Sequence, residues 1–390
     1  MSALPAAPPD PPFRVAIIGF GAAAQAFVPA FKAHPSFECV AVVEPHPEVQ
    51  GLARAMGFQV FSQLSDLKSV PHLDGVYIAT PTPLHATQTI QCLEAGWHVL
   101  VEKPMAANAA EALRMVQASE RCGKRLTVGH SHSFDAPIQA MKQIIERGEL
   151  GVIQMVNTWC FTDWVYRPRR PEELDPDLGG GVLFRQGAHQ IDILRALCGG
   201  HVKSVKAKVF NADPQRATTG AHSIYLEFDN GAAATAIYSG YGGMSSMDLT
   251  HNISEWGFEH SPQQRTWYTR SQSAMSPEQT LQAKQQRART AIPDNASFQP
   301  HFGLTVAHGS LGDMRQTPTG LVVSNDSGDT HIQLSNLHSP RDLVLAELAQ
   351  TWQYAGTESP AWHDGPWGYN NLRVCEAAVE SAQSGYEVRL

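Results

Sequence analysis

The chain has 390 residues, of which 43% are hydrophobic and 17% charged, and its formal net charge is −8. That length exceeds what one hydrophobic core usually holds, so we expect two domains. A mildly acidic protein gives no electrostatic support for binding nucleic acid or an anionic membrane, and no apolar run approaches the ~18 residues that span a bilayer. We therefore expect a cytoplasmic protein with no nucleic-acid or membrane partner, whose six scattered cysteines are reduced thiols.

The first twelve residues contain five prolines and have neither a basic head nor an apolar stretch. Such a segment is a poor signal peptide. We predict a flexible arm over residues 1–12.

Strand and helix patterns alternate from residue 13 to about residue 130. Apolar strands are expected at 14–18, 39–43, 76–79, 97–101 and 126–129. Helices are expected after the first strand, over 84–95, and after Asn108, where Glu111 completes a capping-box pattern. This alternation is typical of a doubly wound parallel sheet, and we predict a dinucleotide-binding Rossmann domain over 13–130.

The remaining residues, 131–390, have a different pattern. A helix over 136–147 precedes strand signals at 152–160, 202–210, 223–228, 232–238, 321–324 and 331–334, and helices are expected near 342–354 and 372–384. Residues 229–231, Asp-Asn-Gly, predict a hairpin turn. We predict an α/β substrate-binding domain with a large open, mostly antiparallel sheet. A long polar insertion near 240–302 interrupts it, and a loop of that length is usually a lid, a binding element or disordered.

The first strand runs into a glycine turn that predicts a dinucleotide site. Gly19 permits the tight turn, and Gly21 lets the backbone approach a pyrophosphate. The helix that follows the turn offers free N–H groups to the phosphates, and the expected cofactor-binding residues include Ala22 and Ala23. Glu44, at the end of the second strand, can accept hydrogen bonds from ribose hydroxyls and would repel a 2′-phosphate. The motif therefore favours NAD over NADP as cofactor, the alternative being a purely structural turn.

Lys103 follows a buried strand within the tripeptide Glu102-Lys103-Pro104. Ligands of open α/β sheets bind at the carboxyl ends of the strands, which places this lysine at a candidate site. An isolated lysine has a pKa of about 10.4 and is a poor base at neutral pH, but burial or a neighbouring cation would lower that pKa. The alternatives are a salt bridge or a solvated strand end.

A third pattern follows the glycine run at 179–181. Arg185, His189 and Asp192 are spaced i, i+4 and i+7, which places them on one face of an α-helix. We interpret this polar stripe as part of a site, although a single histidine on a helix is more often structural. His130 and His132 lie two residues apart, and we interpret them as a polar strand end rather than a metal pair, so no metal site is predicted.

Together these motifs resemble the glucose–fructose oxidoreductase / inositol dehydrogenase family: the strand–Gly19-x-Gly21 turn, Thr80-Pro81 with His85, Glu102-Lys103-Pro104, and the helix with His189 and Asp192. The resemblance implies a Rossmann domain followed by an α/β domain whose open sheet often builds homodimers or homotetramers. It implies that Lys103 and His189 are catalytic and flank the substrate carbon that faces the nicotinamide. It also implies that the cofactor site includes Thr80, Pro81, His85 and Glu102.

One position departs from the family pattern. Sugar-oxidising members usually carry an aspartate four residues before the histidine, where this chain has Arg185. Arginine presents a planar fork to carboxylates, so an anionic substrate becomes the expectation. Residues 298–305 and 312–316 resemble the phthalate 4,5-cis-dihydrodiol dehydrogenase branch, which implies oxidation of phthalate 4,5-cis-dihydrodiol to 4,5-dihydroxyphthalate in aromatic degradation. The expected substrate-binding residues are Arg185, Arg167, His130 and Asp192.

Two alternatives stay open at this point. The first is another enzyme of the same family, acting on a sugar, a polyol or another aryl dihydrodiol. The second is a catalytically silent NAD-binding regulator, which the presence of both Lys103 and His189 disfavours.

Overall fold

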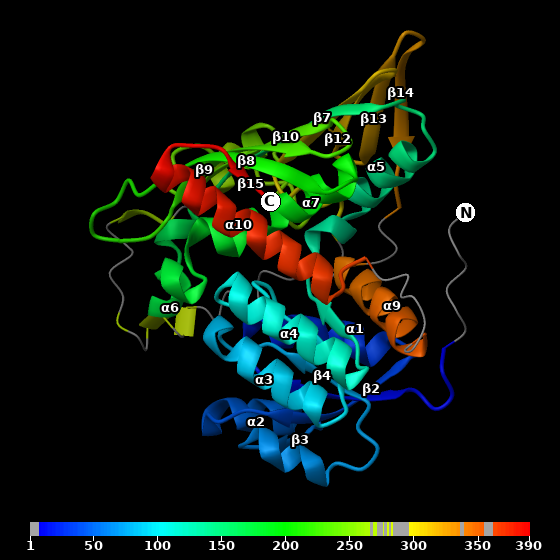
Figure 1. Ribbon diagram of the computed structural model, residues 1–390, viewed down its shortest axis with the longest axis vertical. Helices are drawn as coiled ribbons and strands as arrows, with labels where there is room; N and C mark the ends of the chain where they lie inside the picture. The colour runs from blue at the N-terminus through cyan, green and yellow to red at the C-terminus, as the bar shows by residue number, and fades with distance from the viewer. Residues whose placement is uncertain are drawn as a thin grey trace. The chain divides into compact units, whose positions relative to one another are not determined.

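The computed structural model describes residues 8–265, 268–270, 276, 279–280, 282–283, 296–335, 339–354 and 362–390. It divides into two compact units, the first formed by Met1–His130 with Arg341–Leu372, the second by Ser131–Pro340 with Arg373–Leu390 (Figure 1). The first seven residues of the predicted arm and parts of the predicted insertion (266–267, 271–275, 277–278, 281 and 284–295) lie outside the described residues.

The first unit is built on a parallel sheet of six strands in the order β3-β2-β1-β4-β5-β6. Its strands are β1 (Phe13–Ile18), β2 (Phe37–Val43), β3 (Gln59–Phe61), β4 (Gly75–Ile78), β5 (His98–Val101) and β6 (Leu126–Val128). The order reverses between β1 and β4, which is the switch point of a Rossmann sheet. The predicted doubly wound fold is confirmed.

Helices cover this sheet and connect its strands. They are α1 (Ala22–Ala33), α2 (Pro47–Ala55), α3 (Thr82–Glu94) and α4 (Ala109–Cys122). A further helix, α9 (Pro340–Gln353), comes from near the end of the chain and connects no strands of this sheet. The predicted cap of α4 is confirmed, because Asn108 Oδ1 accepts a hydrogen bond from the Glu111 N–H at 2.9 Å. Helices α3 and α4 lie side by side (Figure 1).

The first unit reaches beyond the predicted 13–130 by including Arg341–Leu372. Trp352 of α9 explains why this distant segment belongs to it. The Trp352 ring lies 5.5 Å from the rings of both Phe13 and Phe37 and stacks on His98 at 5.3 Å. A Cβ on Gly75 would come within 2.3 Å of the same indole, so glycine is required there. Burial of so large an aromatic surface stabilises the docked helix.

The second unit is built on a nine-stranded sheet, ordered β14-β13-β12-β11-β7-β10-β9-β8-β15. Its strands are β7 (Ile153–Phe161), β8 (Val202–Phe210), β9 (Ala221–Phe228), β10 (Ala233–Ser239), β11 (Leu304–Gly309), β12 (Gly312–Thr317), β13 (Gly320–Asn325), β14 (Gly328–Gln333) and β15 (Val388–Arg389). Only β10 and β7 pair in parallel among the described strands of this sheet. The mostly antiparallel sheet is confirmed, and the parallel pair is an addition that the sequence did not indicate.

Helices cover one face of this sheet. They are α5 (Ala136–Glu146), α7 (Ala188–Cys198) and, from Arg373 onward, α10 (Gly365–Ser384), whose residues divide between the units. The short helix α6 (Pro171–Leu174) and a π-helix (Leu183–Gly187) precede α7 in the chain. Helix α7 packs on β7 and β10, and α5 packs on α7 and β13. Every residue of α7 is buried, so its polar side chains lie in the interior.

Short 3₁₀ turns complete the two units, at Leu64–Ser69, His132–Phe134, Trp164–Tyr166, Pro176–Leu178, Ser246–Asp248 and Pro262–Gln264. None of the helices in the described part of the chain combines the length and hydrophobicity that crossing a membrane requires.

Candidate functional site

The glycine turn after β1 has a geometry that only glycine satisfies. Gly19 has φ +82°, and its N–H donates to the Val43 carbonyl at 2.8 Å. An added Cβ would lie 2.9 Å from Thr80 Cγ2 and 3.0 Å from the Ala79 carbonyl oxygen. The turn therefore packs directly against the loop that follows β4, as a dinucleotide turn must at a sheet switch point.

The start of α1 is open to a ligand. Gly21 is the N-cap residue and provides no side-chain cap, and Gly21, Ala22 and Ala23 are all exposed. A Cβ on Gly21 would meet nothing within 4 Å. The first-turn N–H groups of a helix need an outside acceptor, and a pyrophosphate supplies one, so this cradle fits a nicotinamide dinucleotide, NAD or NADP.

Glu44 braces the same turn from the end of β2. Its carboxylate is buried at 5% exposure, with Oε2 accepting the Phe20 N–H and Oε1 accepting the His46 N–H, each at 2.9 Å. The predicted ribose-binding residue thus also holds the glycine turn in place. A carboxylate has about four acceptor sites, so two backbone bonds leave capacity for a ribose hydroxyl.

Replacing Gly19 by alanine is expected to lower the free energy of unfolding by about 1–3 kcal/mol, because a side chain at this φ is strained. NAD binding should weaken as well, since the Cβ displaces Thr80. Gly51→Ala is the matched control: it lies within α2 with nothing within 4 Å of an added Cβ, and should stabilise by roughly 0.5–1 kcal/mol. Thermal unfolding with and without NAD measures both, and a Gly19→Ala protein as stable as wild type would contradict the prediction.

His85 joins two loops at the carboxyl edge of the sheet. Its Nδ1 lies 2.9 Å from the Pro104 carbonyl oxygen and its Nε2 lies 2.9 Å from the Thr80 carbonyl oxygen. The ring is 1% exposed. His85, predicted from the family motif to be a cofactor residue, therefore ties the Thr80-Pro81 loop to the Glu102–Pro104 turn from inside the unit.

Glu102 and Lys103 follow β5. Glu102 Oε1 accepts a hydrogen bond from the Tyr77 hydroxyl at 2.7 Å, and the Glu102 N–H donates to the Ile78 carbonyl at 2.9 Å. Burial, reinforced by the Glu102 charge, raises the pKa of Tyr77 well above its usual value, so the phenol is a fixed donor. Lys103 is half-buried and stands two residues beyond Val101, at the edge where β1 and β4 also end.

His130 lies inside the first unit. It is 3% exposed, its Nε2 is 3.3 Å from Asn371 Nδ2, and its ring centroid is 6.0 Å from that of His363. His132 belongs to the second unit, and both of its ring nitrogens face carboxylates. Within the described residues no group of three or more metal-ligating side chains could hold a metal ion.

His189 and Asp192 lie on α7, buried at 3% and 0% exposure. Arg185 instead lies in the π-helix that precedes α7. The predicted stripe assumed α-helical spacing, and that spacing does not apply to Arg185, because π-helical hydrogen bonds run from i to i+5. Single π turns occur frequently at functional sites.

Arg185 contacts an internal carboxylate. Its NH2 group lies 3.4 Å from Glu173 Oε1, and Arg169 NH1 lies 3.7 Å from the same oxygen. Glu173 is buried at 3% exposure, and its other oxygen accepts the Arg170 N–H at 2.8 Å. We call Arg169, Glu173 and Arg185 the arginine cluster; its three side-chain charges sum to +1, which favours an anion nearby.

Arg167, the other predicted substrate arginine, pairs with Asp163. Its Nε lies 2.6 Å from Asp163 Oδ1, whose partner oxygen accepts the Tyr268 N–H at 2.8 Å. Burial lowers the pKa of the Arg167 guanidinium, but Asp163 and other nearby groups together have the larger effect. The pKa is therefore raised above its usual value. Arg167 is therefore a fixed, charged side chain whose charge Asp163 offsets.

The sequence did not reveal the surroundings of His132. Its Nδ1 lies 3.1 Å from Asp135 Oδ2 and its Nε2 lies 3.3 Å from Glu255 Oε1. Burial lowers the pKa of His132, but the two carboxylates together raise it to about 9. Its ring centroid is 4.6 Å from that of His189, with the planes at 80°. Asp135, three residues on, was the only local signal, because Glu255 is distant in sequence.

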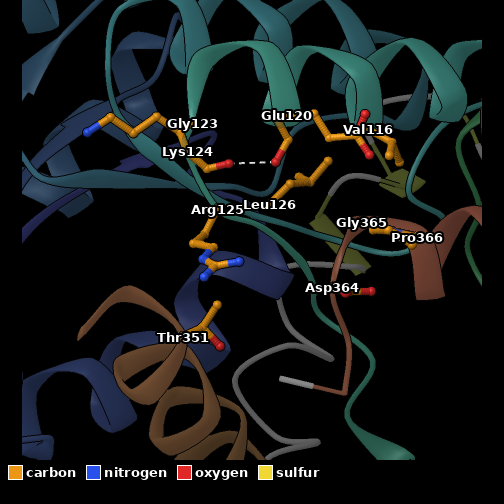
Figure 2. A pocket seen from close by; sticks show the side chains of 11 residues that line it. Val116, Glu120, Gly123, Lys124, Arg125, Leu126, Thr351, Asp364, Gly365 and Pro366 are labelled. Atoms are coloured by element: carbon orange, nitrogen blue, oxygen red, sulfur yellow. Dashed lines mark hydrogen bonds between the residues drawn. The ribbon is translucent and has the colours of Figure 1, made fainter. Parts of the chain in front are cut away.

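A cavity of about 320 Å³ lies between α4, the start of β6 and the segment before α10 (Figure 2). Lys124, Arg125 and Asp364 line it, with Leu126 at the first position of β6. Because parallel strands share a direction, this cavity lies at the amino edge of the sheet, opposite the glycine turn. It is separate from the nucleotide cradle.

Comparison with known proteins agrees with this geometry. Residues 13–130 match the oxidoreductase family with an NAD-binding Rossmann fold, and residues 138–247 match the GFO/IDH/MocA C-terminal domain. The chain is 34% identical to 1-carboxy-3-chloro-3,4-dihydroxycyclohexa-1,5-diene dehydrogenase from Comamonas testosteroni, over 95% of both chains. It is 28% identical to 4-carboxy-2-hydroxymuconate-6-semialdehyde dehydrogenase from Sphingobium sp. SYK-6, over 57% of this chain and 70% of that one.

A solved structure extends the likeness to three dimensions. A protein from Bordetella bronchiseptica RB50, described as a dehydrogenase, superposes with a TM-score of 0.88 at 32% identity, over 97% of this chain and 100% of that one. Other solved structures at 18–22% identity share the fold. The chain therefore belongs to the Gfo/Idh/MocA family of NAD(P)-dependent oxidoreductases, as its motifs predicted.

Proposed function

We propose that this enzyme uses NAD to oxidise a carboxylated cyclic cis-diol, with phthalate 4,5-cis-dihydrodiol as the best candidate and 4,5-dihydroxyphthalate as its product. The observation that carries the proposal is the arginine cluster, in a chain whose full-length relative is named for a carboxylated dihydroxycyclohexadiene. Sugars and inositol carry no carboxylate, and a site with a net positive charge gives them no comparable attraction.

NAD is the proposed cofactor because of Glu44. Its buried carboxylate lies against the glycine turn, where it can accept a ribose hydroxyl and would repel the 2′-phosphate of NADP. When bound, NAD supplies the acceptor for the hydride that the substrate carbon gives up.

The chain's own residues move the proton and hold the substrate. Lys103 accepts the proton of the reacting hydroxyl, and His189 hydrogen-bonds the hydroxyl or shuttles that proton. Arg185 binds a carboxylate, with Arg167 as the second candidate. The ketone formed would tautomerise to an aromatic catechol, which favours oxidation.

A substrate panel tests the proposal. Purified enzyme is mixed with NAD or NADP and with phthalate dihydrodiol, a monocarboxylated dihydrodiol, myo-inositol or glucose, and NADH or NADPH formation is followed by absorbance. We expect the highest kcat/KM with NAD and phthalate dihydrodiol. If only the monocarboxylated diol were turned over, phthalate dihydrodiol would be excluded as the substrate. The proposed substrate class, carboxylated cyclic cis-diols, would still hold. Turnover of inositol or glucose alone would reject the proposal, and tight NAD binding without any turnover would indicate a silent regulator.

A further inference from the structure

His132 is held at both ring nitrogens. The 3₁₀ turn His132–Phe134 places Nδ1 against Asp135, three residues on, and Nε2 against Glu255. The ring is 4% exposed, so water competes little for these bonds. The two carboxylates face nitrogens on different sides of one ring, so a single metal ion could not bridge all three groups.

The His132 ring also packs directly against the ring of His189. His132 stacks on Phe302 with centroids 4.3 Å apart and planes at 24°, and it meets His189 in a T-shaped contact at 4.6 Å. Phe302 also contacts His189, at 5.2 Å and 62°. The His189 imidazole is therefore bounded by two rings that are themselves stacked, which restricts its rotation.

These partners come from the segment predicted as an insertion near 240–302. Glu255, Trp256 and Phe302 all belong to it, and the Trp256 ring lies 5.5 Å from His132. Part of this insertion thus reaches the neighbourhood of the predicted proton-transfer histidine. Its attachment to His132 combines one ion pair with ring contacts.

We propose that His132 is a positioning residue that anchors the insertion through Glu255 and fixes the orientation of the His189 ring for its part in the reaction. The role of His189 in that reaction rests on the proposed function. The anchoring and the ring orientation are properties of the folded chain and are measurable without substrate.

The anchor depends on charge. A neutral imidazole has one N–H, so only the imidazolium donates to Asp135 and Glu255 together. Among the described residues, the titratable groups that contact His132 are these two carboxylates and His189, and Glu255 also contributes to the raised pKa of Arg167. Because the folded pKa of His132 is raised from 6.5 to about 9, the stability that its charge contributes is fully present below pH 6.5 and is lost as the pH rises through about 9, where the imidazolium itself deprotonates.

The test replaces Glu255 by glutamine, which keeps an acceptor and removes the charge. We expect kcat to fall about 10- to 100-fold through misplacement of His189, with the KM for NAD unchanged. The loss of one opposite charge should lower the pKa of His132. The alkaline decline of kcat should therefore begin about one pH unit lower than in wild type. Glu255→Asp, which keeps the charge, should return the alkaline decline of kcat to its wild-type pH. Glu259→Gln, an exposed carboxylate of the same segment, is the matched control and should behave as wild type.

Histidine NMR separates this inference from the proposed function. In wild type, His132 should titrate near pH 9, and Glu255→Gln should lower that midpoint and shift the His189 ring resonances, while Glu259→Gln should do neither. These outcomes hold even if no diol is turned over. The inference would be overturned if His132 titrated with a midpoint near pH 6.5. It would also be overturned if Glu255→Gln had the same His189 resonances, kcat and pH profile of kcat as the control variant.

Discussion

Replacing Lys103 by methionine is expected to lower kcat about 10²- to 10⁴-fold, the range attributed to a positioned general base. Methionine keeps most of the side-chain length but cannot accept a proton. The KM for NAD and the thermal unfolding temperature should stay near wild type, because Lys103 is half-buried at the sheet edge and lies outside the glycine cradle. Initial rates of NADH formation with saturating diol give kcat, and fluorescence titration gives NAD affinity.

Lys124→Met is the matched control for this prediction. Lys124 lies in the same unit but lines the cavity at the amino edge of the sheet (Figure 2), so its loss should leave kcat unchanged. A Lys103→Met enzyme with near-normal kcat would show that another group accepts the proton. A large drop in Lys124→Met would instead indicate a general loss of folding.

Replacing Arg185 by glutamine is expected to lower kcat/KM for a carboxylated diol by about 10²- to 10³-fold, because the variant removes the cation that we propose binds a substrate carboxylate. Arg169 still faces Glu173 in this variant, so the buried carboxylate keeps a cation at 3.7 Å and the fold should survive. Any residual activity toward uncharged diols should change little. The comparison of kcat/KM between carboxylated and uncharged substrates is the measurement.

Arg147→Gln serves as the control, since Arg147 pairs with Glu149 on the surface of the same unit. It should match wild type in both kcat/KM and stability. If Arg185→Gln lost stability but kept its preference for carboxylated substrates, Arg185 would be a structural partner of Glu173. The carboxylate-binding role would then pass to Arg167 as the next candidate.

Most of the first unit was predictable because its signals are local. The strand before Gly19, the capping pattern of Asn108 and Glu111, and the strand that leads to Lys103 each involve residues within a few positions of one another. Parallel topology then followed from the alternation of these elements. The docking of Trp352 was not predictable, because no short-range pattern connects α9 to Phe13 or His98.

In the second unit the sequence indicated which residues belong near the site, but it did not indicate which side chains those residues contact. Arg185 was recognised as a cation beside the expected site, but its contact with Glu173 and its place in a π-helix were not foreseen. Strands β11 and β12 were noticed as family motifs and not as strands. Periodicity describes one segment at a time, whereas a helix register or a sheet partner is set by what packs on that segment.

By itself, the sequence determined the family, the fold class and the position of the glycine turn, since motifs of fixed spacing encode these features locally. It also singled out Lys103, His189 and Arg185 as candidate site residues. Only the tertiary structure decided that Glu44 braces the glycine turn and that His132 is held by carboxylates against His189. The physical reason is burial. Burying a charged group costs free energy unless an opposite charge or a hydrogen-bond partner compensates for the lost water. In a folded chain that partner can come from any point in the sequence.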